Sequence, residues 1–195
     1  MSETYAQIRG WSYVPHITFS EKAPIQIDIR RRRVAVMLGT MHEYKQIDII
    51  VSEWNLDLPL KIIGRCGDQY FKKLNAIKAS KTNGNLIQIE NRELSDTEYD
   101  ETLLQCKYVL ISFSLQSAYV SGAIHHALSF GCIPIMYPSL YRNELIAQGL
   151  PILKVEEFAA DIDDCSPKFE SYFLKFGTAS VANAWKQLVG SVYDD

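Results

Sequence analysis

Two short apolar runs, separated by a polar loop and a helical pattern, lie within residues 108–136 and constrain the fold more than any other feature. The runs YVLI and IPIM have the length and composition of buried strands. Between them, Ile124, Ala127 and Leu128 recur at helical spacing, and Gly131 predicts the end of that helix. Because two strands joined through a helix normally lie parallel, this unit predicts a parallel sheet.

The same alternation of strand and helix runs through most of the chain. A capping box of Ser95 and Glu98 opens one of the predicted helices. The pattern predicts an α/β fold, a single doubly wound, Rossmann-like parallel sheet over residues 33–195, which ends in two helices broken near Gly177. Residues 1–32 are punctuated by proline, and we expect an extended lead-in or linker there. Strands are predicted at 34–38, 60–63, 86–89, 108–112, 133–136 and 151–155. Helices are predicted near 44–54, 69–79 and 141–148, with one more that Ser95 opens and one from Ser121 that Gly131 ends.

Composition narrows the class of protein. The chain has 195 residues, of which 47% are hydrophobic, enough to bury one core. A net charge of -3 gives no reason to expect a nucleic-acid partner. The sequence shows neither a signal peptide nor an apolar run long enough to cross a bilayer, so a cytoplasmic location is expected. The four cysteines form no CxxC pair, which indicates reduced thiols and predicts no metal site; no cofactor is expected either.

Two further segments allow alternative interpretations. The four arginines at 30–33 fit a solvated sheet edge or peripheral contact with acidic lipid. The run FESYFLKF at 169–176 fits packing against the sheet or a membrane-facing stripe.

Four segments, taken in order, carry a family resemblance. VAVMLGTMHEYKQID, LKIIGRCGDQYFKKL, NLIQIENRELSDTEY and CKYVLISFSLQSAYVSGAIHHALSFGCIPI together resemble the C-terminal, donor-binding domain of GT-B glycosyltransferases, especially the group 1 family. The resemblance covers about residues 33–160, and the order of the segments is more specific than any one motif. It implies a domain that binds a nucleotide-diphosphate sugar of the UDP or GDP type.

The resemblance also implies a set of site residues. In the family, the loop after the first strand carries a glycine and a lysine that meets the donor diphosphate, and a turn with glycine follows the second strand. A small residue and a glycine open the later helix, where free backbone N–H groups suit a pyrophosphate. The matching positions for the diphosphate are Gly39, Thr40, Lys45, Gly64, Arg65, Ser121 and Gly122, and those for the nucleobase are Arg92, Glu93 and Leu94.

Two positions depart from the family pattern. Retaining members place two glutamates, with seven residues between them, where this chain has Ala118 and His126. An imidazole can donate or accept a hydrogen bond, so His126 has two interpretations, a contact to ribose or phosphate and a structural helix residue. The chain therefore offers no evident general base, and its catalytic residues stay unassigned.

The length of the chain raises further alternatives. A complete GT-B enzyme has a second sheet that binds the acceptor, whereas this sequence predicts one sheet. The resemblance thus implies a donor-binding domain that works with a separate or missing acceptor domain. Two other hypotheses stay open: a nucleoside deoxyribosyltransferase-like or phosphoribohydrolase-like enzyme, and a non-catalytic binding or scaffolding module.

Overall fold

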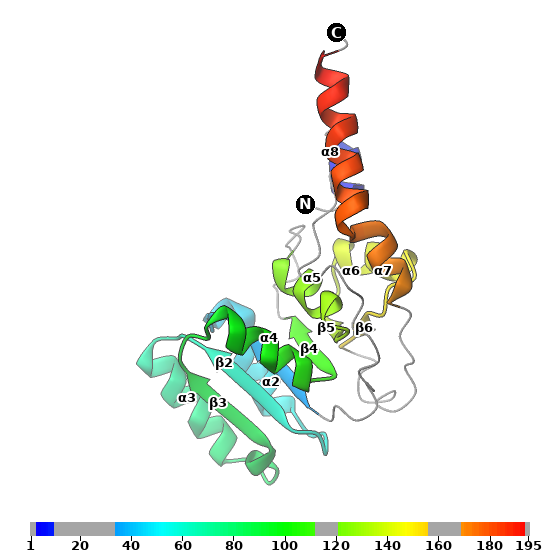
Figure 1. Cartoon of the computed structure of the whole chain (residues 1–195). Coiled ribbons are helices and arrows are strands. Elements are labelled where there is room, and N and C mark those ends of the chain that lie inside the picture. Colours follow the sequence, from blue (N-terminus) through cyan, green and yellow to red (C-terminus); the bar gives the residue numbers. More distant parts are fainter. Residues whose placement is uncertain (1–2, 10–33, 112–120, 156–168, 194–195) are drawn as a thin grey trace.

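A computed structural model describes residues 3–9, 34–111, 121–155 and 169–193 of the chain (Figure 1). Six strands form one sheet in the order β3-β2-β1-β4-β5-β6, and every neighbouring pair is parallel. The sheet confirms the predicted Rossmann-like α/β fold. The strands are β1 (Ala35–Leu38), β2 (Leu60–Gly64), β3 (Ile87–Asn91), β4 (Tyr108–Ile111), β5 (Ile133–Met136) and β6 (Leu153–Lys154).

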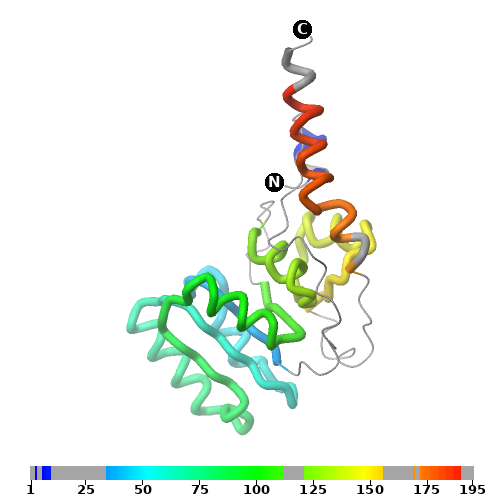
Figure 2. Tube along the Cα trace, in the orientation of Figure 1, coloured from blue at the N-terminus to red at the C-terminus, as the bar shows by residue number. Residues whose placement is uncertain are grey.

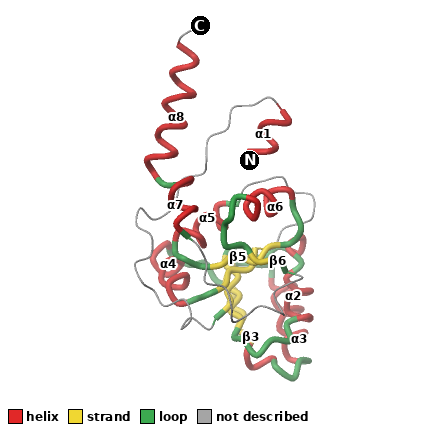
Figure 3. The backbone as a smooth tube through the Cα atoms, turned by 90° about the vertical axis from the view of Figure 1, so that its right-hand side faces the viewer, coloured by secondary structure: helices red, strands yellow, loops and turns green. Residues whose placement is uncertain are grey.

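Helices cover both faces of this sheet, as Figure 3 shows from the side. Helices α2 and α3 lie on one face, whereas α4, α5, α6 and α7 pack on the other. The division follows from strand order, because right-handed crossovers that run in opposite directions along a sheet leave helices on opposite faces. The helices are α1 (Glu3–Arg9), α2 (Ile47–Glu53), α3 (Asp68–Ala79), α4 (Asp96–Gln105), α5 (Gly122–Ser129), α6 (Leu140–Ala147), α7 (Glu170–Phe176) and α8 (Thr178–Tyr193), with short 3-10 turns η2 (Glu43–Lys45) and η3 (Gly84–Leu86).

Each face of the sheet has its own hydrophobic core. In β1, Ala35 and Met37 contribute to the core under α2 and α3, and Val36 and Leu38 contribute to the opposite one. All four side chains are buried. A strand buried on both faces is apolar throughout, which is why the sequence shows continuous apolar runs and no alternation with polar residues.

Local capping signals in the sequence appear in the structure as predicted. Ser95 caps α4 by accepting a hydrogen bond from the Glu98 N–H, and the Glu98 carboxylate accepts from the Ser95 N–H at 2.9 Å. Ser121 caps α5 by accepting from the Ala123 N–H at 3.2 Å. Gly131 follows α5 with a φ of 68°, a left-handed conformation that glycine adopts at little cost.

Two segments differ from their predictions. The helix expected near 44–54 is split into η2 and α2, because Gln46 adopts a φ of 54° between them. Residues 3–9, expected to be part of an extended lead-in, form α1. Long-range contacts explain this helix: the Glu3 N–H donates to Glu144 at 3.1 Å, and the Lys175 ammonium pairs with the Glu3 carboxylate at 2.8 Å. The rest of the lead-in lies outside the described residues, as do the arginines at 30–33.

The C-terminal part of the chain leaves the sheet through α7 and continues into α8, which projects away from the labelled strands in Figure 1 and forms the red upper part of the tube in Figure 2. The two helices are separated at Gly177, as predicted. In α7, Tyr172 and Phe176 are buried against the sheet-side core, while Leu174 is 80% exposed. None of the described helices is both long enough and apolar enough to span a membrane.

Candidate functional site

A pocket of about 230 Å³ opens where the strand order reverses, between the carboxyl ends of β1 and β4. In open parallel sheets this switch point is the usual place for a ligand. The ends of β1 and β4 form its floor. Gly39, Lys45, Tyr99, Ser121 and Ala123 contribute from the surrounding loops and helices.

Glycine backbone shapes the first wall of the pocket. Gly39 has a φ of 97°, and a Cβ at this position would meet no atom within 4 Å, so the space above its backbone is open to a ligand. Gly64 has a different role. A Cβ there would lie 1.9 Å from the Gly39 oxygen, so only glycine lets the ends of β1 and β2 approach this closely. The Gly39 N–H donates to Ile63 at 3.0 Å and the Met41 N–H to Arg65 at 2.8 Å, which fixes the loop.

Lys45 provides a positive charge at the pocket. Its ammonium donates to the Thr40 carbonyl at 2.5 Å, and burial lowers the pKa of Lys45. Within the described ranges, no carboxylate pairs with it, and no other charged residue lines the pocket. A half-buried ammonium that has only a carbonyl as its partner is suited to bind an anion, because an anion restores the solvation that burial removes.

The start of α5 faces the pocket from the β4 side. Ser121 and Ala123 line the pocket, and Gly122 is the first residue of the helix. The first N–H groups of a helix have no partner within the helix, and the helix dipole makes this end positive. The ammonium of Lys45 and the start of α5 therefore both favour negative charge in the same pocket.

His126 lies one turn into α5, in a cluster that connects α5 to α4. Its Nε2 lies 2.7 Å from an oxygen of Asp100, and its ring stacks on Tyr99 with a centroid distance of 4.6 Å. Tyr99 lines the pocket, and burial raises its pKa to about 12, which keeps its hydroxyl protonated. Among the described residues, none hydrogen-bonds that hydroxyl, so it is available as a donor. His126 thus packs against Tyr99, which lines the pocket, and does not line the pocket itself.

Arg65 and the predicted nucleobase segment lie at the neighbouring ends of β2 and β3. Arg65 pairs with Glu93 at 3.2 Å, and both side chains are exposed. Arg92 pairs with Glu90 and Glu98 at 2.6 and 2.8 Å. Leu94 packs at the edge of the α4-side core. These residues form a charged rim beside the pocket and do not line it, so their assignment to the donor stays a prediction.

Some of the residues predicted from the sequence line this pocket, and other lining or neighbouring residues were not predicted. Gly39, Lys45 and Ser121 meet at one pocket. Tyr99 and Asp100 were missed, because the sequence gives no signal that joins the first turns of α4 to His126. Ala118 lies outside the described residues. In the part of the chain that the structure describes, no three histidines, cysteines or carboxylates are grouped to hold a metal ion.

Comparison with known proteins finds similar folds but no similar sequence. The sequence matches no protein family and no curated protein. Several glycosyltransferase structures have a similar fold. AviGT4, a glycosyltransferase involved in avilamycin A biosynthesis, aligns with a TM-score of 0.67 at 10% identity, over 95% of this chain and 60% of AviGT4. The C-terminal domain of the group 1 family glycosyl transferase LpcC from Francisella tularensis aligns with a TM-score of 0.51 at 13% identity, over 88% and 96% of the two chains.

A third structure carries a nucleotide. HepE of Anabaena in complex with UDP aligns with a TM-score of 0.60 at 12% identity, over 100% of this chain and 54% of HepE. The chain thus spans little more than half the length of HepE and 60% of AviGT4. The comparisons confirm the predicted resemblance at the level of fold: this chain has a Rossmann-like α/β fold similar to that found in GT-B glycosyltransferases, including the C-terminal domain of LpcC.

Proposed function

We propose that the chain binds the diphosphate of a nucleotide sugar between Lys45 and the start of α5, as the donor-binding domain of a GT-B glycosyltransferase. The observation that carries this proposal is the half-buried Lys45 ammonium, which lacks a described carboxylate partner and lines a pocket at the sheet's switch point. Two observations support an anionic nucleotide as the ligand: the positive charge of Lys45 at the pocket, and the UDP in the HepE structure, which has a similar fold.

The second part of the proposal concerns catalysis. The neighbours HepE and AviGT4 are longer, and the chain spans 54% and 60% of them. We propose that acceptor binding and the general base come from another domain or another polypeptide. The chain alone is then expected to transfer no sugar, because a transferase needs both reactants held in line.

Calorimetric titration tests the binding step. UDP and GDP should bind with dissociation constants of about 0.05 to 1 mM, on the order of 4 to 6 kcal/mol. Uridine and guanosine should bind much more weakly. Lys45→Met should weaken diphosphate binding by about 1 to 3 kcal/mol, because it removes a charge-assisted contact.

Lys72→Met is the matched control, since Lys72 is exposed on α3 and does not line the pocket. Arg65→Met, measured alongside, decides whether the charged rim contributes. Nucleotide binding that is unchanged by Lys45→Met would refute the site. Tight binding of adenine nucleosides without any need for a diphosphate would favour the nucleoside-processing hypothesis.

A further inference from the structure

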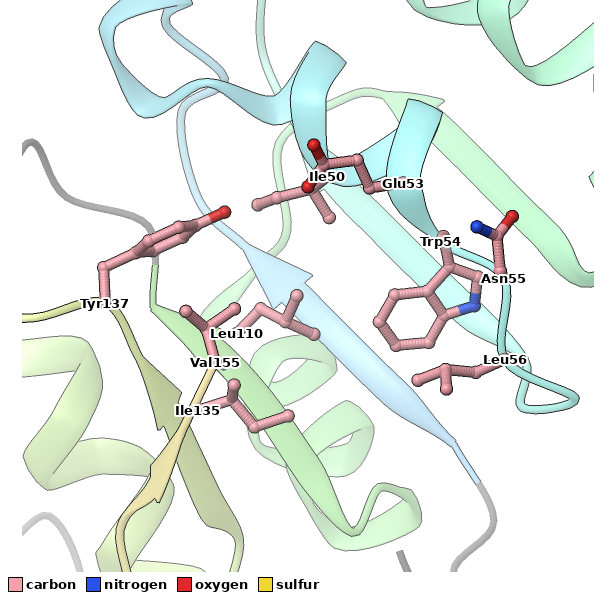
Figure 4. Close-up of a pocket in the computed structure, with 9 residues that line it drawn as sticks. All are labelled: Ile50, Glu53, Trp54, Asn55, Leu56, Leu110, Ile135, Tyr137 and Val155. Carbon is pink, nitrogen blue, oxygen red and sulfur yellow. The ribbon is translucent and has the colours of Figure 1, made fainter. Parts of the chain in front are cut away.

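A second cavity, of about 280 Å³, lies on the opposite side of β4 from α5 (Figure 4). Its walls are Leu110 of β4, Ile135 of β5, Val155 after β6 and Trp54 after α2. At about 30 Å³ per water, the space corresponds to roughly nine waters. It is therefore large enough for an aromatic ring with a short side chain.

Topology explains why this cavity exists. Helices α2 and α3 follow β1 and β2 and cover that half of the sheet, while the helices after β3, β4 and β5 lie on the other face. Within the described ranges, no helix covers β4, β5 and β6 on the α2 side. The cavity is the space that this leaves beside α2. It lies on the face of the sheet opposite to the face that α5 covers.

The Trp54 ring forms an apolar wall of the cavity. The Trp54 side chain is only 4% exposed, and its indole Nε1 donates to the Leu58 carbonyl at 2.9 Å. Its one polar group is thus satisfied by the protein, and Figure 4 shows the ring beside Leu56 and facing the strand residues. An apolar or aromatic group in the cavity gains contact with this ring without leaving a polar atom unpaired.

The other end of the cavity is acidic. Figure 4 shows the Glu53 carboxylate and the Tyr137 hydroxyl pointing toward one another. Burial, followed by the charge of Glu53, raises the pKa of Tyr137, which agrees with their proximity. Glu53 is exposed, and no lysine or arginine of the described segments pairs with it. The cavity thus combines an apolar aromatic wall with an uncompensated negative charge at one end.

We propose that this cavity binds a small organic cation, an arylammonium or alkylammonium compound, with its ammonium at Glu53 and its apolar part against Trp54 and Ile135. Charge complementarity selects this class, because the Glu53 carboxylate attracts the ammonium and the indole ring of Trp54 contacts the apolar part of the ligand. An anion such as a nucleotide is repelled here, whereas the pocket at Lys45 attracts it. The cavity is therefore a second site, and it does not depend on the proposed donor site.

Three probes that share a phenethyl group and carry a positive, a neutral or a negative head group test the proposal on the full chain at pH 7. They are phenethylammonium, phenethyl alcohol and hydrocinnamate. The readout is the indole N–H cross-peak of Trp54 in a nitrogen-15 NMR spectrum, assigned by its loss in Trp54→Phe. Phenethylammonium should shift this peak to saturation, phenethyl alcohol should bind about five-fold more weakly, and hydrocinnamate should not bind.

Variants show whether the charge of Glu53 or the shape of the cavity determines the affinity for the probes. Glu53→Gln should lower the affinity for phenethylammonium to that for the alcohol and leave the alcohol unchanged. Glu101→Gln, an exposed change on α4 of the opposite face, should alter neither. Added UDP should leave the affinity for phenethylammonium unchanged, even if the donor-site proposal fails. The proposal is overturned if the three probes bind equally, if none shifts the Trp54 peak, or if Glu53→Gln retains the preference for the cation.

Discussion

Gly64→Ala tests whether the close approach of β1 and β2 holds in place the loop after β1, which carries Gly39 and Lys45. The new Cβ would lie 1.9 Å from the Gly39 oxygen and 2.6 Å from the Gly39 carbon. Real carbon–oxygen contacts are more than 1 Å longer, and both neighbours are backbone atoms, so the strand ends must separate. Overpacking costs about 1 to 3 kcal/mol, and weakening the Gly39 and Met41 hydrogen bonds adds about 1 kcal/mol.

The expected loss of stability is therefore about 2 to 4 kcal/mol. For a chain of this size, that lowers the melting temperature by about 4 to 16 °C. Thermal unfolding followed by circular dichroism measures it. The same variant should bind UDP more weakly, because Gly39 and Lys45 move with the loop.

Gly67→Ala is the matched control for this substitution. Gly67 precedes α3 with a φ of −67°, and a Cβ there would meet no atom within 4 Å. We expect its melting temperature to change by less than about 2 °C, since a small loss of helix capping and a gain in chain entropy nearly cancel. A Gly64→Ala protein that melts with the parent would refute the argument that β1 and β2 are locked together here.

Four smaller predictions concern the pocket and its supports. The affinity for UDP should fall as pH rises through the pKa of Lys45, which burial lowers below its ordinary value of 10.5, because the neutral amine no longer attracts phosphate. Calorimetry in a pH series measures this decline. Lys45→Arg should abolish it. Tyr99→Phe should weaken UDP binding by about 1 kcal/mol in the same assay without changing the melting temperature by more than about 2 °C. Ser95→Ala should cost about 1 kcal/mol in urea unfolding, because the capping box of α4 is lost. His126→Ala should weaken UDP binding, and adding Asp100→Asn should restore much of it; equal binding by both variants would contradict this coupling.

Much of the fold could be predicted because its signals are local. Strands buried on both faces are continuous apolar runs, and the caps at Ser95 and Ser121 sit at the positions their side-chain chemistry requires. The break at Gln46 was missed, because a non-glycine residue adopts a φ of 54° only where surrounding structure imposes it. Helix α1 was missed for a related reason, since Glu144 and Lys175 are far from it in sequence.

The candidate site was predictable to the extent that parallel strands bring their carboxyl ends together. This rule alone brings Gly39, Lys45 and Ser121 to one edge. It does not separate lining residues from supporting ones. Gly64 looks like a ligand-binding glycine in the sequence, yet the structure gives it a packing role, since its missing Cβ makes room for Gly39. Tyr99 looks like an ordinary helix residue, yet it lines the pocket.

The charges around the pocket give the reason why we expect His126 to affect anion binding, although it does not line the pocket. Asp100 directly follows Tyr99, so an acidic group lies next to the wall of the pocket for which we propose an anionic ligand. The hydrogen bond of 2.7 Å to His126 engages this carboxylate on the side of α5. Without the imidazole, the Asp100 charge would lose its partner and would oppose phosphate in the pocket more strongly. Glu93 shows the opposite arrangement at the rim, where its carboxylate compensates the charge of Arg65. Lys45 differs from both because, among the residues that the structure describes, its ammonium contacts only the Thr40 carbonyl, and for this reason the free energy of anion binding should depend most on Lys45.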